Sequence, residues 1–252
     1  MIQRAKPLLG TIVSIRADAG HDVIDEAFAG VALVHRLMSP EEPSSDISRI
    51  NAEAHRQAVS VHPWTFRVLK SAGSMSRASG GAFDVTLRRH GATHADIVLD
   101  RGRVRLGRRA ELDLGGIAKG FAVDRAVDIL RRRGATQGCV NAGGDLRLFG
   151  THIEDVRVRL PSSPAHCIPV ASASNRAFAT SAGYFQDEAV DARTGERSCA
   201  GRSITVGAPT CMIADALTKA VAALGPIPAL LRQFAAEAHL IDRHGRLHAA
   251  AG

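Results

Sequence analysis

The segment DLGGIAKGFAVDRAV, Asp113 to Val127, decides the interpretation of this sequence. It places an acid, two glycines, a lysine and a third glycine directly before a helical pattern, which predicts a helix that begins near Ile117. The first N–H groups of a helix bind anions, phosphate above all, when glycines let a ligand approach the backbone. Two interpretations remain open from these residues alone. The segment is either a phosphate site to which Lys119 adds a charge, or a tight turn capped by Asp113.

The composition is that of an ordinary globular protein, with 252 residues, 45% hydrophobic and 23% charged. The net charge is +7, and only four of the 32 basic residues are lysines, which leaves 28 arginines. Aromatic residues make up 4% of the chain, too few for a surface on which nucleic-acid bases stack. We therefore interpret the arginine clusters as solvated faces and expect no nucleic-acid partner.

The four cysteines, Cys139, Cys167, Cys199 and Cys211, are widely spaced and form no C-x-x-C pair. This spacing indicates neither a zinc site nor a disulfide framework. The first twenty residues contain no apolar segment of signal-peptide length, and we expect no transmembrane segment. A cytoplasmic location is the expectation, and a periplasmic one stays open if a leader precedes this sequence.

Periodicity predicts one α+β domain over residues 1–252, with mixed sheets and interleaved helices. Ser45 or Asp46 is expected to cap a helix after a Pro/Ser-rich loop. The expected helices cover residues 22–38, 64–79, 121–133 and 211–224, with Gly134 and Gly225 following the last two. The expected strands lie at 10–18 and 203–209, with strand–turn–strand units at 95–107, 139–150 and 239–250.

Asp215, Thr218 and Lys219 lie at i, i+3 and i+4 and therefore share one face of the last of these helices. A carboxylate and a hydroxyl are hard oxygen ligands that suit Mg²⁺. The alternative is an exposed Asp–Lys pair worth about 0.3 kcal/mol. Small or apolar neighbours on nearly every side make a merely solvated face the weaker interpretation.

Several segments, in this order, resemble the ApbE family of FAD:protein FMN transferases. They are LLGTIVSI, SSDISRIN, GGAFDVT, DLGGIAKGFAVD, NAGGDLRLFG, ATSAGYF, DARTGE and SITVGAPTCMIADALTK, and the resemblance runs from about Leu8 to Gly225. It implies an α+β fold around a FAD cleft, with Mg²⁺ at the pyrophosphate. It also implies a reaction in which FMN passes from FAD to a threonine of a partner flavoprotein and AMP is released.

The resemblance also implies roles for individual residues. The expected catalytic residues are Asp215 and Lys219. The expected metal ligands are the carbonyl of Gly116, the side chain of Asp215 and Thr218. The residues expected to contact FAD are Leu9, Ala82, Phe83, Asp84, Asp113, Lys119 and Val190.

Departures from the family pattern leave alternatives open. Lys219 stands where the family commonly has threonine, so its ammonium either replaces the metal or swings away and leaves Thr218 as a ligand. Glu41 lies near the place of a family aromatic, Glu188 replaces a histidine and Ala192 replaces a proline. Two alternative functions therefore stay open. In these alternatives, the protein is either a FAD pyrophosphatase or a non-catalytic, flavin-binding relative. The protein is expected to be a monomer or a homodimer.

Overall fold

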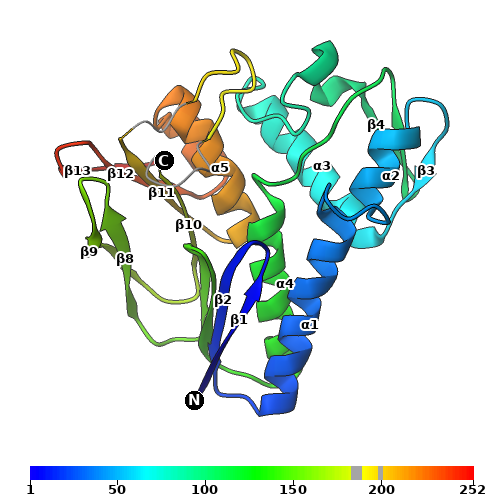
Figure 1. Cartoon of the computed structure of the whole chain (residues 1–252). Helices are drawn as coiled ribbons and strands as arrows, with labels where there is room; N and C mark the ends of the chain where they lie inside the picture. Colours follow the sequence, from blue (N-terminus) through cyan, green and yellow to red (C-terminus); the bar gives the residue numbers. More distant parts are fainter. Residues whose placement is uncertain (183–188, 198–200) are drawn as a thin grey trace.

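An eight-stranded sheet forms the centre of the computed structural model, which describes residues 1–182, 189–197 and 201–252 (Figure 1). Its strand order is β1-β2-β6-β7-β10-β11-β12-β13. Every strand pair in the described residues is antiparallel, so the α+β class is confirmed but the expected mixed sheets are antiparallel throughout. The strands are β1 (Ile2–Leu8), β2 (Thr11–Ala17), β6 (Gly138–Ala142), β7 (Asp145–Phe149), β10 (Ala177–Ala182), β11 (Ser203–Ala208), β12 (Glu237–Ile241) and β13 (Leu247–Ala251).

Three helices cover one face of this sheet: α1 (His21–Met38), α4 (Ala118–Arg132) and α5 (Cys211–Leu224) (Figure 1). Alternation along the strands explains this layer, because Val13 and Ile15 of β2 are fully buried while Ser14 between them points to the other face. The main core therefore lies between the sheet and these three helices.

A hairpin of β8 (Glu154–Leu160) and β9 (Ser163–Ala173) packs on the opposite face of the sheet. It encloses a small second core with Leu148, Phe178 and Ile241. This hairpin was not predicted from the sequence. The prolines of β9 obscure its strand pattern, although the alternation of apolar residues with arginines in β8 is itself a strand signal.

A second group of elements lies at the end of the sheet where the helix α4 begins (Figure 1). Ser45 caps α2 by accepting the N–H of Ser48 at 3.0 Å, which confirms one of the two expected caps. The group contains α2 (Asp46–Glu53), α3 (Pro63–Ala78), the sheet β3 (Val59–Ser60), β5 (Arg103–Leu106) and β4 (Ile97–Asp100), and the short helical turns Arg89–Gly91 and His94–Asp96. The remaining helix, α6 (Pro228–Gln233), precedes β12.

The expected long helices and strand–turn–strand units are present, with Gly134 and Gly225 following α4 and α5. In the part of the chain that the structure describes, no helix has both the length and the apolar character needed to cross a membrane. The assignment of residues 1–252 to a single domain stays a prediction.

Helices α4 and α5 hold each other through two buried aspartates. Asp124 of α4 accepts the backbone N–H groups of Cys211 and Met212, each at 3.0 Å, at the start of α5. Asp215 of α5 accepts the N–H of Gly120, at 3.0 Å, in the first turn of α4. Each carboxylate thus satisfies the N–H groups that a helix start leaves without an intrahelical partner, at its positive end.

Removal of the Asp124 carboxylate tests how much this contact contributes to the free energy of unfolding. Asp124 also pairs with Arg147 at 2.7 Å, and both side chains are largely buried. We expect Asp124→Ala to lower the free energy of unfolding by ~3–5 kcal/mol, because it leaves Arg147 uncompensated. Urea denaturation measures the change. The matched control, Glu26→Ala, breaks a pair with Arg133 in which both side chains are about half exposed, and it should cost less than about 1 kcal/mol. Equal losses in the two variants would refute the assigned role.

Candidate functional site

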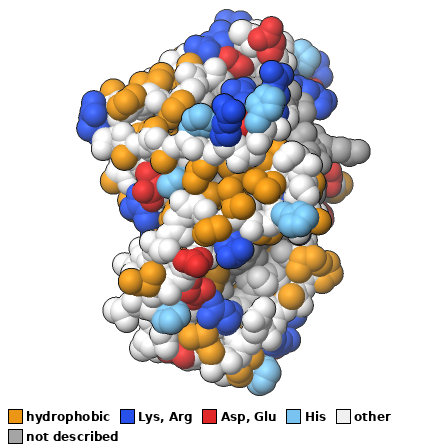
Figure 2. Space-filling model, turned by 90° about the vertical axis from the view of Figure 1, so that its left-hand side faces the viewer, with side chains coloured by type: hydrophobic (Ala, Val, Ile, Leu, Met, Phe, Trp, Pro, Cys, Tyr) orange, Lys and Arg blue, Asp and Glu red, His pale blue; other side chains and the backbone are white. Residues whose placement is uncertain are grey.

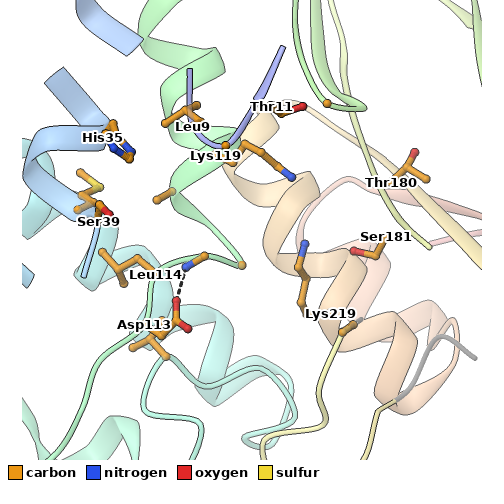
Figure 3. A pocket seen from close by; sticks show the side chains of 18 of the residues that line it. Leu9, Thr11, His35, Ser39, Asp113, Leu114, Lys119, Thr180, Ser181 and Lys219 are labelled. Atoms are coloured by element: carbon orange, nitrogen blue, oxygen red, sulfur yellow. Dashed lines mark hydrogen bonds between the residues drawn. The ribbon is translucent and has the colours of Figure 1, made fainter. Parts of the chain in front are cut away.

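A cavity of about 1100 Å³ opens between the turns at one end of the large sheet and the loops of the second group of elements. The β1–β2 turn, the end of α1, the start of α4, the β6–β7 turn, the end of β10 and the middle of α5 surround it. Figure 3 shows Leu9, Asp113, Lys119, Ser181 and Lys219 around the same space. Segments that are more than 200 residues apart in the sequence therefore contribute to one site.

The glycine-rich segment lies at the cavity as the sequence predicts. Asp113, Gly115, Gly116 and Lys119 all line it, and α4 begins directly after Ile117. Asp113 Oδ1 accepts the N–H of Gly115 at 2.8 Å, the contact drawn as a dashed line in Figure 3. Asp113 therefore orders a tight turn, as one of the two interpretations expects, and the same turn faces the cavity. Phosphate binding at this turn stays a prediction.

Two acids and two lysines gather at the inner wall of the cavity. Lys219 Nζ lies 2.6 Å from Asp215 Oδ1, and Lys119 Nζ lies 3.4 Å from Asp145 Oδ2. Both carboxylate side chains are essentially inaccessible, at 0% and 1% exposure, whereas the lysines are 21% and 29% exposed. The interpretation of Asp215 and Lys219 as an exposed surface pair is therefore wrong.

Charge interactions within this cluster are strong. Burial and the neighbouring Asp215 raise the pKa of Asp145 to about 7, against the opposing effect of Lys119 and Lys219. Lys119 and Lys219 extend from their helices toward one another in Figure 3. The cluster presents ammonium groups to the cavity while it keeps the carboxylates behind them.

The expected metal ligands do not form an open oxygen site. One oxygen of Asp215 holds Lys219 and the other accepts the N–H of Gly120. The hydroxyl of Thr218 is buried, donates to the carbonyl of Asp215 at 2.7 Å and lies 2.8 Å from Ser181 Oγ. The described residues contain no group of three or more His, Cys, Asp or Glu that would hold a metal. As folded, this donor set fits an ammonium and not Mg²⁺.

Gly116, the third expected metal ligand, lies against Lys219 and Phe83. A Cβ atom at this position would lie 3.4 Å from Lys219 Cε and 3.4 Å from Phe83 Cε2. The backbone of Gly116 therefore packs close to the lysine stem and to the ring.

Two of the expected FAD contacts, Asp84 and Ala82, have mainly structural partners. Asp84 has a fully buried side chain, which accepts the N–H and hydroxyl of Thr86 and the N–H of His94. The carbonyl of Ala82 accepts the N–H of Ala192 at 3.1 Å, and Ala82 is fully buried. These contacts fix the loop that carries Phe83, whose ring lines the cavity. Direct contact of Asp84 and Ala82 with FAD stays a prediction.

Leu9 and Val190 line the cavity from two further loops. Leu9 has a φ of 56° and Gly10 a φ of 69°, as a two-residue turn between β1 and β2 requires. A left-handed conformation costs a leucine roughly 1–2 kcal/mol, so the turn keeps this side chain at the cavity despite local strain.

The sequence analysis does not name Asp145 or Ser181 as site residues. The signal for Asp145 is the turn NAGGD, whose glycines both have positive φ and place the acid at the start of β7. Glu41 lines the cavity in place of the family aromatic. Glu188, Cys199 and the last three residues of ATSAGYF lie outside the described residues.

On the face shown in Figure 2, the basic side chains do not form one continuous stripe. Lys and Arg side chains are interspersed there with apolar, acidic and histidine side chains.

Comparison with known proteins identifies the family. The model of the ApbE family matches residues 9–95 and 87–240. The chain belongs to the ApbE family. A FAD:protein FMN transferase from Treponema pallidum (strain Nichols) is 26% identical over 313 residues, covering 99% of this chain and 86% of that protein. Its counterpart from Vibrio cholerae serotype O1 is 27% identical over 235 residues, covering 76% and 70%.

Solved structures of ApbE proteins share the fold. The flavin transferase ApbE from Vibrio cholerae has a TM-score of 0.85 at 22% identity, covering 100% of this chain and 96% of that chain. The ApbE protein from Thermotoga maritima has a TM-score of 0.82 at 23% identity, covering 98% and 96%. The expected family and fold class are confirmed.

Contact between α4 and α5 at the site is tested by Gly120→Ala. A Cβ atom at Gly120 would lie 2.3 Å from the carbonyl oxygen of Cys211 and 2.8 Å from Asp215 Cβ, so the helices must separate. We expect a loss of ~1–3 kcal/mol in the free energy of unfolding, measured by urea denaturation. Gly73→Ala is the matched control, because its Cβ would meet only Arg77 Nη1, at 3.5 Å, from a half-buried position in the helix α3. It should gain about 0.5–1 kcal/mol, and the same sign in both variants would contradict the packing argument.

Proposed function

We propose that this chain transfers FMN from FAD to a threonine hydroxyl of a partner flavoprotein and releases AMP. Membership of the ApbE family and relatives named FAD:protein FMN transferase support this activity. The single observation that carries it at residue level is the meeting of a glycine-lined helix start with two lysine ammonium groups in one cavity. That combination suits the two negative charges of a dinucleotide pyrophosphate.

The proposed reaction is a phosphoryl transfer. The threonine oxygen forms a bond to the FMN phosphorus while the bond from that phosphorus to the bridging oxygen breaks. AMP leaves with the bridging oxygen and its electron pair, and the hydroxyl proton passes to solvent. The protein supplies positioning and positive charge, which provide most of the catalysis in such reactions.

The cavity residues divide by chemistry. Gly116 and Lys119 are proposed to bind the pyrophosphate. Asp113 holds the turn that precedes them by accepting the N–H of Gly115. Leu9, Phe83 and Val190 offer apolar surface to the ring systems of FAD. Asp215 acts behind this surface by holding Lys219 toward the transferred group.

Mg²⁺ dependence through Gly116, Asp215 and Thr218 is what the family resemblance implies, but the donor set as folded does not fit that ion. The monomeric or homodimeric state and the cytoplasmic location stay predictions. Titration calorimetry with Mg²⁺ tests metal binding, sedimentation tests the oligomeric state, and cell fractionation tests the location. The names of the relatives specify a protein acceptor, and the threonine is proposed from the family resemblance alone.

Mass spectrometry of an acceptor tests the function. A candidate flavoprotein subunit, incubated with FAD and this protein, should gain one FMN on a threonine, and its Thr→Ala variant should gain none. Release of FMN and AMP without any acceptor would favour the pyrophosphatase. FAD that is bound and never cleaved would favour the non-catalytic relative.

Asp215→Asn tests the site within the same assay. The amide keeps the size of the side chain and still accepts the N–H of Gly120, but it no longer holds the Lys219 ammonium by charge. We expect transfer to fall by about 100-fold or more, with circular dichroism unchanged. Asp100→Asn, on an exposed strand end, is the control and should retain full activity. Normal transfer by Asp215→Asn would remove Asp215 from the mechanism.

A further inference from the structure

We propose that the ammonium of Lys219 is the resident cation of the pyrophosphate site, so that this chain binds FAD without a divalent metal. The inference rests on the proposed function, because it concerns the same cavity and the same substrate. It assigns to one side chain the positive charge that the family resemblance assigns to Mg²⁺.

Position is the first argument. Lys219 Nζ lies 2.6 Å from Asp215 Oδ1, on the carboxylate expected to bind the metal. The lysine stem passes against Gly116, whose carbonyl is the second expected ligand. Lys219 thus contacts one expected ligand directly and passes beside the residue that carries another.

The remaining ligands give the second argument. The other oxygen of Asp215 is engaged by the N–H of Gly120, and the hydroxyl of Thr218 is turned to the Asp215 carbonyl and to Ser181. A divalent ion at this point would have to displace the Lys219 ammonium from the Asp215 carboxylate. The displaced ammonium would stay nearby, and its positive charge would repel the ion.

The ammonium also has donors to offer. Its contact with Asp215 engages one of three N–H groups, and the side chain lines the cavity. A fixed ammonium beside Lys119 supplies hydrogen-bond donors and charge to a pyrophosphate without any requirement for metal coordination geometry.

FAD binding, followed by the change in flavin fluorescence, tests the inference with and without Mg²⁺. Wild-type protein in EDTA should bind FAD with the same Kd as in excess Mg²⁺. Lys219→Met in EDTA should bind about tenfold to a hundredfold more weakly, the range for loss of one hydrogen bond to a charged group. Lys70→Met, on the exposed face of α3, is the control and should match the wild type.

Two further variants separate charge from folding. Lys219→Thr offers an oxygen beside the freed carboxylate, so Mg²⁺ should restore much of its FAD affinity. Asp215→Asn combined with Lys219→Met removes both charges and leaves no uncompensated carboxylate, so it should fold, bind FAD weakly and gain nothing from Mg²⁺. Circular dichroism verifies that both variants are folded.

Electron paramagnetic resonance of Mn²⁺ gives a readout that needs neither FAD nor turnover. Wild-type protein should leave Mn²⁺ free, whereas Lys219→Thr should bind one equivalent. Mn²⁺ binding by the wild type, or FAD binding that requires Mg²⁺, would overturn the inference and leave the proposed function standing. Failure of the wild type to bind FAD with or without Mg²⁺ would instead overturn the proposed function.

Discussion

The reciprocal contact between α4 and α5 is the constraint on which the rest of the site depends. Asp124 holds the first N–H groups of α5, and Asp215 holds the N–H of Gly120 near the start of α4. Because Lys119 belongs to α4 and Lys219 to α5, these bonds also set the distance between the two ammonium groups. Each bond is made to a buried charge at a helix start, where loss of one partner leaves the other without compensation.

The glycines of the opening segment have three different physical causes. Gly115 donates its N–H to Asp113 in a tight turn, Gly116 packs against the stem of Lys219, and Gly120 permits α4 to approach the Cys211 carbonyl. Only the first is a property of the local sequence. The other two depend on α5, which begins about ninety residues later, so they become understandable only when the helices are placed together.

Prediction from the sequence succeeds where a local pattern decides the structure. The 3.6-residue period placed the long helices, and alternation with glycine turns placed β4–β5, β6–β7 and β12–β13. It failed for β8–β9, whose burial comes from contacts with Phe178 and Ile241 of other strands. The family resemblance alone marks Asp84 as a ligand contact, and in the fold Thr86 and His94 donate to its carboxylate. Asp145 becomes a site residue only through its contact with Lys119. Such pairings across the chain carry no periodic signal.

The electrostatic design of the site follows from the order of its charges. Two ammonium groups alone would repel each other and turn toward solvent, since a lysine stem has four flexible bonds. The buried acids Asp145 and Asp215 reduce that repulsion, Asp145 to a degree that grows as the pH rises through its raised pKa of about 7. Each acid holds one lysine ammonium, while the partly exposed lysine side chains still face the cavity. Part of the net positive charge is lost, which lowers the attraction for any distant anion. What the site gains is orientation, because donors fixed before binding need no reorganisation when charge develops on a phosphoryl group. The acids thus contribute to phosphate chemistry by holding the bases in place.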